Sequence, residues 1–202
     1  MKKHFIPVMI MAAALCGCGG SDDSGPIITK QEIKVVDGHF SPEIMHQLGK
    51  VSDPQLSPDG TRILYGVTYT SIEQNKGNRE LYLMNLDGSN NVKITATPKS
   101  DSHARWISDS QMIYMRGGKL YTASLNGTTL SSEIEVAGAE GMEGFELSPA
   151  GDKIMFIKSV KAAVKPADLY PDLDKSSGRT YTDLMYRHWD HFVEEVPHTY
   201  IA

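Results

Sequence analysis

From residue 50 onward, short apolar runs alternate with clusters of Gly, Pro, Asp and Asn. The runs are rich in β-branched and aromatic residues, a pattern typical of strands joined by tight turns. Before them, residues 41–49 predict one short helix, because Ser41 suits the N-cap, Pro42 the first helical position and Gly49 the C-terminal end. The pattern therefore predicts an all-β body preceded by a short helix.

An internal repeat organises this body. The stretch 54–65 aligns with 145–156 position for position and without a gap, and 104–114 is the same unit shortened by one residue. A second unit, at 80–88 and again at 119–127, ends in Asp-Gly or Asn-Gly, which are strong hairpin signals. Two hairpins in each repeat predict one four-stranded sheet.

The turn of the first unit explains why it recurs. In Ser-Pro-Asp-Gly at 57–60, proline fixes one backbone angle, aspartate can bond the local backbone, and glycine tolerates positive φ. A β-sandwich also has many strands, but it does not predict a Ser-Pro-x-Gly unit at this spacing. We therefore expect an incomplete β-propeller of three four-stranded blades, at about 51–98, 99–140 and 141–202. Three blades cannot close a ring, so exposed strand edges are expected.

Large aromatic residues recur at strand positions of the repeats. Because sheet stacking needs such residues, we interpret them as packing between adjacent blades rather than as a substrate platform. They are Tyr65, Tyr82, Tyr114, Tyr121 and Phe156. The stretch 161–179 lacks this rhythm and is expected to be a solvated acidic loop between strands.

The first residues have the features of an export signal. Lys2 and Lys3 precede an apolar stretch, 5–15, that is too short to span a membrane. Leu-Cys-Gly-Cys at 15–18 then resembles a bacterial lipobox, with Cys18 as the lipidated residue; an ordinary secretory signal is the alternative. We expect a signal peptide at 1–17, a flexible tether at 18–40 and a lipid-anchored protein of the cell envelope.

Composition narrows the function classes. Among 202 residues, 20 Lys+Arg face 25 Asp+Glu, and a net charge of −5 argues against a nucleic-acid partner. Both cysteines lie in the first twenty residues, which excludes an internal disulfide or a Cys-based zinc site in the body of the chain.

Two motifs carry a family resemblance. Ser-Pro-Glu at 41–43 with the run at 48–61, and Tyr-Arg-His-Trp-Asp at 186–190, resemble the prolyl oligopeptidase family of serine peptidases. Within that family, 41–202 is most similar to acylaminoacyl-peptidase and dipeptidyl-peptidase 5-like members. The resemblance implies a propeller that caps an α/β-hydrolase domain with a Ser-Asp-His triad and admits short peptides to it.

The sequence contains no Gly-x-Ser-x-Gly nucleophile elbow, so no catalytic residue is assigned. We interpret it as the N-terminal propeller fragment of an exported serine exopeptidase, inactive alone. The alternative is a non-enzymatic TolB-like propeller lipoprotein that acts as a protein-binding scaffold, because the Ser-Pro-Asp-Gly turn also occurs there.

The histidines and carboxylates between residues 188 and 198 could be interpreted as a metal site. Imidazole and carboxylate suit zinc, but the histidine spacing matches no helical pair, so we expect no metal and no cofactor. The Glu-Glu pair is expected in a turn, and we do not assign it to binding a substrate amine. The residues concerned are His188, Asp190, His191, Glu194, Glu195 and His198.

Overall fold

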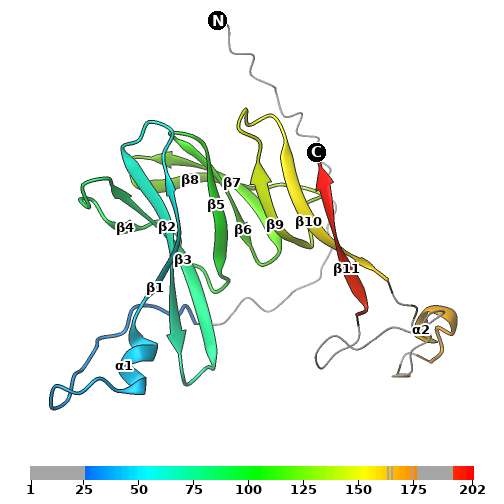
Figure 1. The fold of residues 1–202 in the computed structure, drawn as a ribbon, viewed down its shortest axis with the longest axis horizontal. Coiled ribbons are helices and arrows are strands. Elements are labelled where there is room, and N and C mark those ends of the chain that lie inside the picture. Colours follow the sequence, from blue (N-terminus) through cyan, green and yellow to red (C-terminus); the bar gives the residue numbers. More distant parts are fainter. Residues whose placement is uncertain (1–25, 163, 165, 174, 177–192) are drawn as a thin grey trace, which may run out of the picture.

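The computed structural model describes residues 26–162, 164, 166–173, 175–176 and 193–202 (Figure 1). Nearly all of the regular structure is antiparallel sheet. The elements in chain order are α1 (Pro42–Gln47), β1 (Lys50–Leu56), β2 (Arg62–Ser71), β3 (Lys76–Asn85), β4 (Val92–Lys93), β5 (Asp101–Ser108), β6 (Gln111–Arg116), β7 (Lys119–Asn126), β8 (Thr129–Glu135), β9 (Met142–Leu147), β10 (Ile154–Lys161), α2 (Pro166–Leu169) and β11 (Glu195–Ile201).

The strands form three successive sheets. The first has the order β1-β2-β3-β4 and the second β5-β6-β7-β8, while the third, in the described residues, has β9, β10 and β11. Strand β5 contacts β1 on one side and β9 on the other, so the first strands of the three sheets come together. We call the side on which these three strands meet the axial edge. This arrangement confirms the predicted incomplete propeller.

The short helix forms as predicted. The Ser41 side chain accepts a hydrogen bond from the Ile44 amide at 3.4 Å, and Ile44 is buried as α1 packs beside β2. Directly after the helix, a Cβ on Gly49 would lie 2.8 Å from the Tyr69 ring and 2.9 Å from Val67. The chain therefore enters the first sheet through a space that fits only glycine.

The repeated turns fold alike. Ser57 donates its amide to the Arg62 carbonyl at 2.9 Å, and the equivalent Ser148 amide bonds the Lys153 carbonyl at 2.9 Å. Gly60 and Gly151 have φ of +71° and +69°, which explains why glycine recurs at this position.

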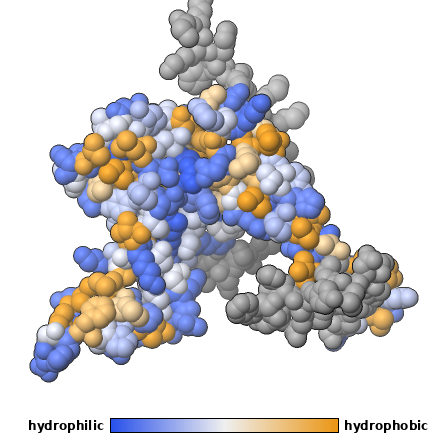
Figure 2. Space-filling view, in the orientation of Figure 1, coloured by the Kyte–Doolittle hydropathy of each residue, from blue (hydrophilic) through white to orange (hydrophobic). Residues whose placement is uncertain are grey.

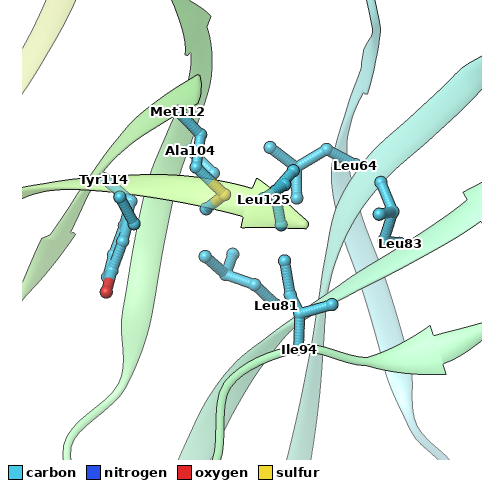
Figure 3. Close-up of a cluster of buried hydrophobic side chains, with 9 residues drawn as sticks. Leu64, Leu81, Leu83, Ile94, Ala104, Met112, Tyr114 and Leu125 are labelled. Carbon is cyan, nitrogen blue, oxygen red and sulfur yellow. The ribbon is translucent and has the colours of Figure 1, made fainter. Parts of the chain in front are cut away.

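Two apolar clusters fill the spaces between the sheets. The first contains nine buried residues (Figure 3): Leu64, Leu81, Leu83, Ile94, Ala104, Met112, Tyr114, Ala123 and Leu125. The second contains Ile113, Met115, Leu120, Ala139, Met142 and Phe145. Because residues of β6 alternate between the two clusters, the second sheet is buried on both faces.

The aromatic residues pair within each sheet. Ring centroids lie 5.7 Å apart in Tyr65–Tyr82, 5.9 Å in Tyr114–Tyr121 and 5.2 Å in Phe156–Tyr200. Each pair joins directly opposed residues of the second and third strands of its sheet. Tyr114 and Tyr121 also pack into the first cluster and Phe156 against the second, as expected, whereas Tyr65 and Tyr82 lie outside both.

The last described strand corrects one expectation. Glu195 is the first residue of β11 and pairs with Lys161, so it lies in a strand and not in a turn. Ile154 and Ala202 exchange both backbone hydrogen bonds, and Ala162 donates to the Glu194 carbonyl at 2.8 Å. Because bonding alternates along an antiparallel pair, even-numbered residues of 194–202 bond β10, and Pro197 faces the other way.

Exposed apolar side chains gather around α1 and the segment before it, at the lower left of Figure 2. Val36 and Phe40 are 70% and 67% exposed, and Val35, Met45 and Leu48 also face solvent.

Neither described helix is long and apolar enough to cross a membrane. Cys18 and the 186–190 motif lie outside the described residues.

Candidate functional site on the axial edge

A line of polar side chains crosses the axial edge. Gln55, Arg105 and Glu146 occupy the same position in the three copies of the repeat. Each is opposite an equivalent residue of the second strand, respectively Leu64, Ile113 and Met155. With Asp53 they form what we call the axial belt: Asp53, Gln55, Arg105 and Glu146.

Arg105 connects the belt across three sheets. Its Nε and Nη2 donate to the two carboxylate oxygens of Glu146 in β9, at 2.9 and 2.6 Å. Its Nη1 donates to both oxygens of Asp53 in β1, at 3.1 and 3.0 Å, and Asp53 also accepts from Gln55 Nε2 at 3.0 Å. One guanidinium thus joins residues that are 41 and 52 positions away in sequence.

Bulges in β1 and β5 set the direction of these side chains. Asp53 has φ of +54°, where the pairing of β1 with β2 shifts register between Ser52 and Gln55. His103 has φ of +51° in the corresponding bulge of β5, just before Arg105. A bulge locally twists a strand and redirects its side chains, which here brings the belt residues toward one another.

A second arginine completes the charge balance. Arg79, on β3, donates from Nη2 to the Ser52 carbonyl at 3.3 Å and lies 3.7 Å from Asp53 Oδ2. The two arginines thus balance the two carboxylates, Asp53 and Glu146. The belt and its neighbour Arg79 carry no net charge at neutral pH.

The pKa shifts agree with this pairing. The hydrogen bond from Arg105 lowers the pKa of the Glu146 carboxyl, and the bond to Glu146 raises the pKa of Arg105 despite its burial. Burial lowers the pKa of Arg79, while Asp53 opposes that shift. Since these groups stay charged and bonded to one another, the belt connects neighbouring strands but offers no poised acid, base or nucleophile.

A separate polar junction lies between the first and second sheets. The buried Glu80 carboxylate accepts from Asn78 Nδ2 at 2.9 Å, Thr95 Oγ1 at 2.8 Å and the Thr97 amide at 2.9 Å. Asp101, also fully buried, accepts from Arg116 Nε at 2.6 Å. Burial raises the pKa of both carboxyl groups. Their partners lie on β3, on β6 and in the connection between β4 and β5, so the junction stabilises the packing of the first two sheets.

The histidines and carboxylates that the sequence analysis weighed as metal ligands are not part of the axial belt. Within the described ranges, no group of three or more His, Cys, Asp or Glu is arranged to hold a metal. His198 lies on β11 opposite Lys158, whereas His188, Asp190 and His191 fall outside those ranges. Sequence reasoning missed the belt, although a polar residue before the turn at the same position of all three copies of the repeat is a signal that could have found it.

Known proteins are similar to this chain in sequence and in fold. No family model matches the chain. Its sequence is 36% identical over 204 residues to dipeptidyl-peptidase 5 of Porphyromonas gingivalis, and 34% over 210 residues to dipeptidyl-peptidase 5 of Porphyromonas endodontalis. Both matches cover 100% of this chain, but only 28% and 29% of the relatives. The fold matches an acylaminoacyl peptidase of Pyrococcus horikoshii with a TM-score of 0.56 and 15% identity, over 78% of this chain and 23% of that one.

Successive antiparallel sheets whose first strands meet at one edge define a β-propeller portion. The sequence similarity over the whole chain supports the resemblance to the prolyl oligopeptidase family, and the fold matches part of an acylaminoacyl peptidase. Within that family it is similar to dipeptidyl-peptidase 5, and it spans less than a third of the length of these curated relatives.

Proposed function

We propose that the chain is the propeller part of an exported serine exopeptidase of the dipeptidyl- or acylaminoacyl-peptidase type. In this role it restricts the access of peptides to an α/β-hydrolase domain that is not part of this sequence. The observation that carries the proposal is the match to dipeptidyl-peptidase 5 over the whole of this chain. The axial belt supports it, because a wall of mutually bonded side chains suits a passage better than a catalytic centre.

The division of labour follows from the chemistry. Acyl transfer from a peptide needs an activated nucleophile, a base to take its proton and donors for the oxyanion. The 202 residues contain no Gly-x-Ser-x-Gly elbow, and the belt supplies none of the three. We therefore assign peptide bond cleavage to the hydrolase domain and access to the propeller.

The test compares this chain with the full reading frame. Residues 1–202 alone should not hydrolyse dipeptidyl or aminoacyl chromogenic substrates, whereas the extended protein should hydrolyse them and react with a fluorophosphonate serine probe. Labelling of a serine within 1–202 that is lost on denaturation would contradict the assignment. An extended protein that folds but is inert to probe and substrates would favour a TolB-like scaffold instead.

We also propose that Cys18 is lipidated and anchors the protein at the cell envelope. The proposal is supported by the two lysines, the short apolar stretch and the Gly-Cys pair at 17–18. In a bacterium with lipoprotein processing, the protein should partition into detergent, and Cys18→Ala should abolish this partitioning. Cys16→Ala is the matched control and should leave it intact; a soluble unsubstituted protein, or equal effects of both substitutions, would contradict the proposal.

A further inference from the structure

Arg105 holds a central position at the axial edge. It is the cation of the belt, and its two carboxylate partners lie on the first strands of the neighbouring sheets. Its side chain is 16% exposed, so its ion pair with Asp53 is partly shielded from solvent, whereas the pair with Glu146 is more exposed. Partly buried, bidentate pairs hold geometry better than exposed single contacts do.

The geometry requires arginine. Nε and Nη2 form a two-pronged contact with Glu146, while Nη1 faces Asp53 and also donates to the Ala104 carbonyl at 2.9 Å. Lysine would offer a single ammonium group and could not span both carboxylates with the same planar fork. Arg105 therefore ties β1, β5 and β9 together through one side chain, in addition to the bond that Trp106 Nε1 on β5 donates to the Gln55 carbonyl on β1 at 3.1 Å.

Arg105 also sets the charge of the edge. Without it, Asp53 would keep Arg79 at 3.7 Å, but Glu146, whose side chain is 53% exposed, would lose its cation. The edge would then become acidic, and its field would attract basic peptides and repel acidic ones.

We propose that Arg105 is a positioning residue that clasps the first strands of three sheets and, together with Arg79, neutralises the two carboxylates of the axial belt. A peptide passing the belt then meets side chains of fixed spacing whose charges balance. The statement about peptides and charge rests on the proposed peptidase function. The statement that Arg105 holds the three strands together does not.

The clasp is tested in this chain by amide hydrogen exchange. Arg105→Gln should raise exchange about tenfold in β1, β5 and β9 together, because all three strands lose the same tie. The matched control is Arg62→Gln, since Arg62 also bridges the first two sheets, through the Asp109 and Gly127 carbonyls, but at the turns. Its effect should be confined to those turns and to the end of β5 near Trp106, whose ring centroid lies 5.4 Å from Arg62 Cζ, and should not reach β9.

Faster exchange in β5 alone, or the same pattern in both variants, would overturn the clasp. If Arg105→Gln does not fold, Arg105→Lys serves instead: it keeps the charge and loses the fork, so exchange in all three strands should still rise. Unchanged exchange in Arg105→Lys would then count against the clasp.

Neutralisation is tested in the full-length protein with dipeptidyl substrates of equal length whose distal residues are acidic, neutral or basic. The unsubstituted enzyme and Arg62→Gln should show kcat/KM values within about threefold of one another, whereas Arg105→Gln should favour basic over acidic peptides by about tenfold. The neutralisation proposal would be overturned if the unsubstituted enzyme discriminated between acidic and basic peptides, or if Arg105→Gln did not. A folded protein that cleaves no peptide would instead contradict the peptidase function, and the exchange experiment would still decide the clasp.

Discussion

Gly66 lies directly beneath the guanidinium of Arg79. A Cβ added to Gly66 would be 2.0 Å from Arg79 Nε and 2.3 Å from Nη2. The arginine starts on the third strand of the first sheet and crosses the second to reach Ser52 and Asp53 on the first. The absence of a side chain at Gly66 is thus what lets Arg79 reach the axial belt.

We expect Gly66→Ala to displace Arg79 and to destabilise the protein by about 1–3 kcal/mol, the usual range for overpacking. Urea denaturation measures this change. Gly77→Ala is the control, because its Cβ would lie 3.4 Å from Thr68 Cγ2, an ordinary contact, and it should change stability little. Equal losses for the two substitutions would show that Arg79 does not need the space.

Glu80 should make stability depend on pH. Burial raises the pKa of its carboxyl above the ordinary value, although bonds from Thr95 and Thr97 oppose the shift. The folded state therefore binds this proton more tightly than the unfolded state does. The contribution of Glu80 is greatest below the ordinary pKa and declines as pH rises through the raised value.

Glu80→Gln keeps an oxygen for Asn78 and Thr97 and removes the charge. We expect this variant to gain stability relative to the unsubstituted protein as pH rises from 5 to 8, in urea denaturation at each pH. Glu80→Ala should lose about 1–3 kcal/mol at both ends of the range, since buried donors lose their acceptor. A pH profile unchanged by Glu80→Gln would contradict the expectation.

The hydroxyl of Tyr114 should stabilise the second sheet. Tyr114 is fully buried, its hydroxyl donates to Glu133, and it accepts from Arg116 Nη2 at 3.3 Å. Tyr114→Phe should cost about 1.5–3 kcal/mol, as expected for a bond to a charged group. Tyr121→Phe is the control, because its bond to Glu135 is exposed and its loss should cost under about 1 kcal/mol. Thermal denaturation should rank the two variants in this order, and the reverse order would contradict it.

Pro197 should limit association through β11. Its nitrogen points away from β10 and carries no hydrogen, so it interrupts the donors along that edge. Pro197→Thr should increase the apparent size of the chain in light scattering. Val196→Thr is the control, because the amide of Val196 faces β10. Protection by Pro197 would be contradicted if both variants remained as small as the unsubstituted chain.

Local chemistry made much of the fold predictable. The glycine at position 60 predicts its turn because few other residues accept positive φ, and the copy at 151 folds in the same way. The continuous apolar run at 63–67 likewise predicts a buried strand, and it lies in β2.

The axial belt could not be predicted in this way. Arg105 meets partners 41 and 52 residues away, and no local preference of an arginine selects them. Their meeting depends on the bulge at Asp53 and on the angle between whole sheets. The contact of Arg79 with Gly66 has the same origin, since it exists only once three strands have paired.

Each sheet has two unlike faces. In the second sheet, Tyr114 points to the sheet before it and Ile113 to the sheet after it, and Phe156 of the third sheet again points backward. A unit of this kind can be copied by tandem duplication of its coding sequence. Each new sheet then has one face that packs on the preceding sheet and one face that packs on the following sheet. The repeat therefore provides a simple evolutionary route by which such a propeller gains or loses blades without the invention of a new interface.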